Sequence, residues 1–160
     1  MRSDRIELPG GAIVEDYFVR ESRGFSVVFA ITPDDRVVLV RQYKHGVGEI
    51  VTELPAGMID EDETPAACAI RELGEETGYT GAPPEPVRTF FADPTNATAH
   101  FHLFVVRDAR PTRAQAFDVT EDIEVELAGI DEVRAMALDG RINAGSQVAS
   151  VLVALAHLGR

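Results

Sequence analysis

Carboxylates crowd the segment GMIDEDETPAACAIRELGEETGY, residues 57–79. If its second half is helical, Glu72, Glu75 and Glu76 fall within roughly a third of the helix circumference, at about 100° per residue. Glu72 and Glu76 are four residues apart, and such a like-charge pair mildly destabilises a bare helix. A merely solvated acidic face would alternate these glutamates with lysines, which this stretch does not contain. Clustered carboxylate oxygens beside the loop LPAG, whose carbonyls are further ligands, therefore indicate a Mg²⁺ or Mn²⁺ site on a solvent-facing arc.

A calcium loop of the EF-hand type is an alternative for the acidic run that begins at Asp60. Its register fails, because the sixth position is Pro65 where that loop needs glycine. The twelfth position is Arg71 where the loop needs a bidentate glutamate. The metal hypothesis therefore stays with the glutamates of the predicted helix.

The helix that carries these glutamates has clear start and stop signals. Thr64 suits the N-cap, Pro65 suits the first helical position, and Gly78 favours a left-handed stop, which together predict a helix over residues 64–77. On the arc opposite the glutamates, the side chains that we expect to pack on a sheet are Ala66, Ile70 and Leu73.

The rest of the chain predicts an α/β protein. β-Branched and aromatic runs bounded by turn residues predict strands at residues 25–32, 36–43, 49–54, 87–92, 99–106 and 121–130. Two further helices are expected at residues 131–138 and 146–158. Because the elements interleave irregularly, we expect a mixed β-sheet with helices on its faces and no doubly wound Rossmann fold. No repeat or linker interrupts the sequence, which predicts one domain over residues 1–160.

Composition restricts the partners and the compartment. Apolar residues make up 45% of the 160 residues, as in a globular protein, and the formal net charge is −12. That charge argues against nucleic acid or an anionic membrane surface as a partner. The single cysteine, Cys68, cannot form an internal disulfide, and the N-terminal residues MRSDRIELPGG lack the apolar core of a signal peptide. We therefore expect a cytoplasmic protein that binds a small molecule.

The spacing of the segment resembles a known signature. Gly57, five residues, Glu63, seven residues and then RELGEETGY (residues 71–79) are similar to the Nudix box of the Nudix hydrolases. VRQYKHG, ELPAG, DPTNATAHFHLF and EDIEV resemble the branch of ADP-ribose and nucleotide-sugar pyrophosphatases. The resemblance implies the Nudix fold, an α/β/α sandwich with a mixed sheet. It also implies metal-dependent hydrolysis of a nucleoside diphosphate linked to a sugar, giving a nucleoside monophosphate and a sugar phosphate.

The resemblance assigns roles within the box. Glu72 and Glu76 would bind the metal with the carbonyl of Ala56, and Glu75 would be a ligand or a partner through water. Glu75 and Glu76 would also be catalytic. The residues with a structural role would be Gly57, Glu63, Arg71 and Gly78, with Glu63 and Arg71 forming an ion pair.

Outside the box, the resemblance assigns a late glutamate and three substrate contacts. Glu121 would be the general base or an additional metal ligand, although Asp118, Asp122 and Glu124 are neighbours that could take this place. Arg41 and Lys44 would reach the phosphates, and Asn96 would lie beside the substrate. Ordinary strand-end solubility is the alternative for the two basic residues, and loop capping for Asn96. The branch usually has arginine at the position of Lys44, which loses a bidentate fork here.

Four further expectations concern the histidines, the aromatic residues, the assembly and the activity. His100 and His102 share one face of a predicted strand, where simple strand residues are favoured over metal ligands. Core positions are expected for Phe90, Phe91, Phe101 and Phe104. By analogy with similar enzymes, we expect a homodimer, with residues 1–23 as a dimerisation segment. The alternative functions are a housecleaning pyrophosphatase for nucleoside triphosphates, and a Nudix domain that senses a nucleotide sugar without hydrolysing it.

Overall fold

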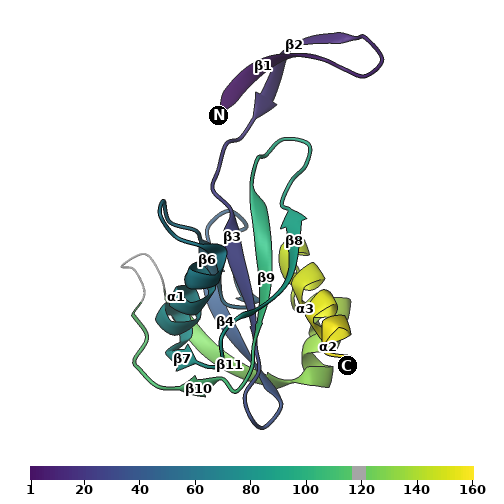
Figure 1. Cartoon of the computed structure of the whole chain (residues 1–160). Helices are drawn as coiled ribbons and strands as arrows, with labels where there is room; N and C mark the ends of the chain where they lie inside the picture. The colour runs from purple at the N-terminus through teal and green to yellow at the C-terminus, as the bar shows by residue number, and fades with distance from the viewer. Residues whose placement is uncertain (117–121) are drawn as a thin grey trace.

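The computed structural model of the chain describes residues 1–116 and 122–160. Figure 1 shows β-sheets between two layers of helices, with α1 on one side and α2 and α3 on the other. This arrangement confirms the predicted α/β/α sandwich. The strands are β1 (Arg2–Glu7), β2 (Ile13–Val19), β3 (Phe25–Ala30), β4 (Arg36–Lys44), β5 (Glu49–Glu53), β6 (Ala56–Met58), β7 (Tyr79–Thr80), β8 (Glu85–Phe91), β9 (His100–Val106), β10 (Arg110–Pro111) and β11 (Ile123–Gly129). The helices are α1 (Pro65–Thr77), α2 (Ile130–Asp139) and α3 (Gly145–His157).

Two sheets form the middle of the sandwich. One has the strand order β6-β3-β9-β8, with β3 and β9 parallel and the other pairs antiparallel, so it is mixed as expected. The other is antiparallel, with the order β11-β4-β5. Side chains alternate between the two faces of β3, so that Val27 and Phe29 pack toward α2 and α3, whereas Val28 and Ala30 pack toward α1. Both helical layers therefore rest on the same strands.

Helix α1 begins and ends as the sequence predicts. The Thr64 hydroxyl accepts a hydrogen bond from the Ala67 N–H at 3.2 Å, and Gly78 ends the helix in the left-handed region at φ 74°. Leu73 packs in the core as expected. Ile70 was expected beside it, but its side chain is half exposed and does not belong to the cluster that contains Leu73. Phe91, expected in the core, is also exposed, since it lies on the edge strand β8.

The first two strands form a ribbon that was not predicted. β1 and β2 pair with each other alone, and Figure 1 shows this ribbon projecting from the sandwich. The ribbon is joined to the sandwich where the Asn96 amide donates to the Phe18 carbonyl at 3.0 Å and the Arg20 N–H donates to the Asn96 carbonyl at 2.7 Å. Its apolar side chains, including Phe18, are therefore largely exposed to solvent.

The other predicted elements lie within a few residues of their expected ends. The main correction concerns Ala56 and Gly57, which were expected in a loop but belong to β6, where they pair with Val27 and Ser26 of β3. This pairing carries the chain directly under α1. Among the described helices, none combines the length and apolar character needed to span a membrane.

Candidate active site

The Glu76 side chain is hydrogen-bonded to β6, the strand that passes under α1. Its Oε2 accepts a hydrogen bond from the Ala56 N–H at 2.9 Å. The side chain is buried, with Glu76 only 3% exposed, so the expectation of a solvent-facing arc was wrong for this residue. The reason is that β6, which begins at Ala56, lies against α1 at this residue. A buried carboxylate needs hydrogen-bond donors, and the Ala56 backbone supplies one.

Gly57 allows a second carboxylate to approach the same strand. A Cβ atom placed on Gly57 would overlap the carboxylate of Glu72, so the two groups are in direct contact. The Glu72 side chain is 13% exposed and stays beside the backbone of β6. The absence of a side chain at position 57 therefore sets where the Glu72 carboxylate lies.

Replacing Gly57 by alanine should displace Glu72 while leaving the fold intact. The overlapping atoms belong to the end of a flexible side chain, so the carboxylate can move aside more easily than the backbone. We expect cation affinity and turnover to fall by about 10-fold or more, as when a ligand loses its support. Mn²⁺ titration, activity and thermal melting measure the three quantities. Gly46→Ala is the matched control, because a Cβ atom there meets nothing within 4 Å. Unchanged Mn²⁺ affinity in Gly57→Ala would contradict this account.

Arg71 holds three glutamates together. Its Nε and one terminal nitrogen each lie 2.9 Å from a carboxylate oxygen of Glu63, which is the expected ion pair. The other terminal nitrogen lies 2.6 Å from Glu72 and 3.1 Å from Glu75. The hydrogen bonds to Arg71 hold the pKa of Glu63 below its ordinary value of 4.5. One guanidinium thus offsets much of the repulsion that the sequence alone suggested.

A cavity of about 610 Å³ opens onto the carboxylates of Glu72 and Glu76. These two residues of α1 line it together with Ala56 and Gly57 of β6. Lys44, at the end of β4, also lines the cavity and forms an ion pair with Glu53 at 3.5 Å. The cavity therefore combines carboxylate and backbone oxygens with one ammonium group.

The other predicted site residues lie elsewhere. Arg41 leaves the opposite face of β4 from Lys44 and forms an exposed contact with Glu124 at 3.4 Å, away from the cavity. Asn96 bonds to the N-terminal ribbon. Glu121 lies outside the described residues, so its predicted role stays a prediction. The structure thus brings Lys44 to the same cavity as Ala56, Glu72 and Glu76. Glu75, which bonds to Arg71, does not line this cavity, and neither do Arg41 and Asn96.

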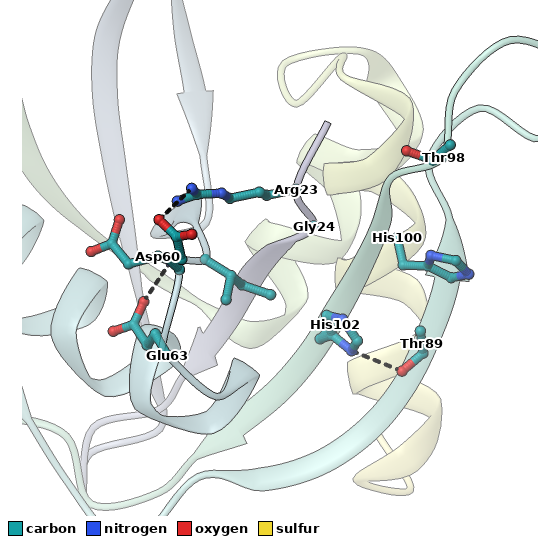
Figure 2. Close-up of a pocket in the computed structure, with 10 residues that line it drawn as sticks. Arg23, Gly24, Asp60, Glu63, Thr89, Thr98, His100 and His102 are labelled. Carbon is teal, nitrogen blue, oxygen red and sulfur yellow. Dashed lines mark hydrogen bonds and ion pairs between the residues drawn. The ribbon is translucent and has the colours of Figure 1, made fainter. Parts of the chain in front are cut away.

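A second cavity, of about 580 Å³, lies between β9 and the loop that carries Asp60 and Glu63 (Figure 2). His100 and His102 line it together, so they do share one face of β9 as expected. The His102 Nδ1 lies 3.0 Å from the Thr89 hydroxyl. Burial of the imidazole lowers the pKa of His102, and the nearby His100 lowers it further. These contacts fit strand residues better than metal ligands.

The residues preceding the undescribed segment dock on the end of α1, which the sequence did not predict. The Gln115 amide donates to the Glu76 carbonyl at 2.6 Å and to the Ile123 carbonyl at 3.1 Å, and the Ala116 N–H donates to the Glu75 carbonyl at 2.9 Å. These bonds satisfy carbonyls that the last helical turn leaves without an intrahelical partner. Such long-range contacts carry no local sequence signal.

The donor groups at the first cavity fit a divalent cation. Within residues 1–116 and 122–160, no three histidine, cysteine or carboxylate side chains converge closely enough to form a complete protein cage for a metal. Mg²⁺, however, usually binds through one or two carboxylates and takes its other ligands from water and substrate phosphates. Glu72, Glu76 and the backbone at Ala56 provide hard oxygens of this kind on one wall.

Comparison with known families decides what the site belongs to. The family profile described as "NUDIX domain" matches residues 21–148. The chain belongs to the Nudix family. The segment from Gly57 to Tyr79 is its Nudix box, and the expected family, fold and class of enzyme, a Nudix hydrolase, are confirmed.

Similar proteins within the Nudix family are named for more than one activity. An ADP-ribose pyrophosphatase of Bacillus subtilis (strain 168) is 31% identical over 133 residues, covering 83% of this chain and 71% of that protein. An ADP-ribose pyrophosphatase of Mycobacterium tuberculosis is 29% identical over 157 residues, covering 96% and 74%. A methanol dehydrogenase activator of Bacillus methanolicus is 31% identical over 152 residues, covering 94% and 82%. These similarities support the predicted pyrophosphatase branch.

A solved structure agrees with the fold of this Nudix chain. The crystal structure of an ADP compounds hydrolase matches it with a TM-score of 0.85 at 21% identity. The match covers 99% of this chain and 86% of that chain. The match therefore includes the N-terminal ribbon, whose two strands precede the residues matched by the family profile.

Proposed function

We propose that this Nudix hydrolase cleaves the diphosphate linkage of ADP-ribose or a related nucleoside diphosphate sugar, with Mg²⁺ or Mn²⁺ as cofactor. The observation that carries the proposal is the cavity in which Glu72 and Glu76 meet the backbone of Ala56 and Gly57, and which Lys44 also lines. Two relatives that each match more than four fifths of this chain are ADP-ribose pyrophosphatases, which supports the substrate class.

The predicted site residues would divide the work of hydrolysis between them. Water attacks one phosphorus, the bridging P–O bond breaks, and the products are a nucleoside monophosphate and a sugar phosphate. When bound, a divalent cation supplies Lewis acidity to the diphosphate oxygens and the attacking water. Glu72, Glu76 and the Ala56 carbonyl would hold it. The water proton goes to a carboxylate, for which Glu121 is the predicted acceptor, while Glu75 is the remaining predicted catalytic group.

Lys44 is the basic side chain that we expect to contact a phosphate in this cavity, because the guanidinium of Arg71, which also lines it, is bonded to three glutamates. It lies beside Glu53, which is largely covered with its side chain 14% exposed. An ammonium group supplies a compact point charge to phosphate oxygens. Arg41 lies on the other face of β4 and does not line this cavity. It would contact the phosphates only if the substrate extended beyond the cavity or lay in the site of a neighbouring subunit, so its predicted role requires a separate test.

Mass spectrometry of products from purified protein, ADP-ribose and Mg²⁺ tests the proposal. AMP and ribose 5-phosphate, formed with Mg²⁺ and not with EDTA, would support it. Intact ADP-ribose would contradict the substrate assignment, and a panel of nucleotide sugars and nucleoside triphosphates would then separate the remaining pyrophosphatases. Tight binding of a nucleotide sugar without turnover of any compound would identify a sensor.

The N-terminal ribbon supports a homodimer as part of this proposal. A two-stranded ribbon is marginally stable in water when it packs on nothing else. Here its apolar side chains are exposed, with Leu8 41%, Ile13 43% and Phe18 54% exposed. A second copy of the chain would cover them.

Phe18→Asp should therefore dissociate the protein. We expect the wild type to sediment as a dimer at micromolar concentration and this variant as a monomer, because a charge would replace the largest exposed apolar side chain of the ribbon. Leu138→Ser, which removes an even more exposed apolar side chain from α2 (69% exposed), is the control and should leave the dimer intact. A wild-type protein that sediments as a monomer would refute the homodimer.

A further inference from the structure

Gln147 bonds to both backbone polar groups of one distant residue. Its Oε1 accepts a hydrogen bond from the Leu54 N–H at 3.0 Å, and its Nε2 donates to the Leu54 carbonyl at 3.4 Å. Gln147 lies in the first turns of α3 and is 4% exposed, and Leu54 is fully buried. The two residues are 93 positions apart in the chain.

Leu54 needs these bonds because the sheet ends before it. The last pair of the β4–β5 ladder joins Val40 to Glu53, so the polar groups of Leu54 lie just beyond it. Buried backbone groups without a partner destabilise a fold. A glutamine amide carries a donor and an acceptor together, so Gln147 takes the place of one more residue of a neighbouring strand.

The segment that follows Leu54 is the one that meets the box carboxylates. The Pro55 carbonyl accepts from the Val28 N–H at 2.9 Å, and the Ala56 N–H donates to Glu76 at 2.9 Å. Three consecutive residues are thus fixed from three directions, by α3 at Leu54, by β3 at Pro55 and by α1 at Ala56. Adjacent Cα atoms are about 3.8 Å apart, so a shift at Leu54 is transmitted to Ala56 and Gly57.

We propose that Gln147 is a positioning residue for the cation site. By fixing the backbone of Leu54, it keeps the Ala56 carbonyl and the surface of Gly57 against Glu72 and Glu76. This inference rests on the proposed function, since it assumes that those oxygens hold a divalent cation. Gln147 also lines the cavity, but both hydrogen bonds of its amide go to Leu54, so it would act on the cation through the backbone of residues 54–56.

Mn²⁺ titration of the full-length protein without nucleotide, followed by electron paramagnetic resonance, tests this role. Gln147→Met keeps a side chain of similar length and removes both hydrogen bonds. We expect its Mn²⁺ affinity to fall about 10-fold, the scale seen when a metal ligand loses a supporting partner. Gln147→Asn retains an amide but is one methylene shorter, so it cannot make both bonds. It should show the same loss, and it replaces Gln147→Met if that variant does not fold.

Val151→Ala is the matched control. Val151 lies one turn further along α3 and is fully buried in the same core cluster as Leu54, so its truncation lowers the melting temperature but removes neither hydrogen bond to Leu54. Its Mn²⁺ affinity should stay within about twofold of the wild type, since only stability is changed. Wild-type affinity in both Gln147 variants would overturn the inference, and so would an equal loss in Val151→Ala. A wild type that binds no Mn²⁺ would overturn the proposed cofactor itself, which the other outcomes leave standing.

Discussion

Glu76→Gln is expected to abolish detectable turnover while the protein stays folded. Glutamine has the same length and retains an oxygen that can accept the Ala56 N–H hydrogen bond seen at 2.9 Å. It removes the negative charge and with it the anionic ligand that we propose for the cation. Loss of a supporting partner alone costs about 10–100-fold, so loss of the ligand should cost on the order of 100-fold or more. Activity assays and circular dichroism of the same preparation measure both effects.

The burial of Glu76 makes the choice of substitution important. Glu76→Ala would leave the Ala56 N–H buried without an acceptor, at about 1–3 kcal/mol, so it would confound catalysis with stability. Glu126→Gln is the matched control, because this glutamate is exposed on β11 and the same charge is removed. Turnover within a few-fold of the wild type in Glu76→Gln would show that Glu76 is not a ligand. Unfolding of that variant would show that its carboxylate is mainly structural.

Arg71→Met is expected to give the largest loss of stability in the box. The guanidinium contacts Glu63, Glu72 and Glu75 and also donates to the Met58 carbonyl at 2.9 Å. Removing one partner of a buried ion pair costs about 3–5 kcal/mol. Because Arg71 is 28% exposed, we expect about 3 kcal/mol here, or a melting temperature lowered by roughly 6–12 °C. Arg134→Met, which removes an exposed pair on α2, should cost less than about 1 kcal/mol.

The loss in Arg71→Met should depend on pH. In the folded protein the Arg71 hydrogen bonds lower the pKa of Glu63 from its ordinary value of 4.5. A lowered folded-state pKa adds stability that is complete above pH 4.5 and disappears as the pH falls through the folded-state value. The melting temperatures of wild type and variant should therefore converge on acidification from pH 7. A difference that stays constant down to pH 3 would refute the contribution of this ion pair.

Local signals were sufficient for α1. Its N-cap at Thr64, its stop at Gly78 and the spacing of its glutamates are all properties of neighbouring residues, and the structure agrees with them. The ion pair between Glu63 and Arg71 could be predicted for the same reason, since the box fixes their separation along the chain.

Features that depend on distant segments could not be predicted from the sequence. The exposure of the Glu76 carboxylate is set by the strand that contains Ala56, which arrives 20 residues earlier in the chain. In the sequence Gln147 is an ordinary polar residue of a predicted helix, and only the structure shows that it bonds to Leu54. The ribbon strands were missed because polar residues occupy both of their faces, as in a ribbon surrounded by solvent, and the alternation that marks a half-buried strand is absent.

The parallel pairing of β3 with β9 sets the order in which the protein can fold. Val27 pairs with Leu103, so the central sheet closes a loop that contains β4, β5, β6 and all of α1. Contacts this distant in sequence form slowly. During synthesis, the strand that covers the inner face of α1 therefore stays without its parallel neighbour until Val106 has left the ribosome. The acidic helix can be complete early, but the central sheet on which it packs is completed only after two thirds of the chain has been made.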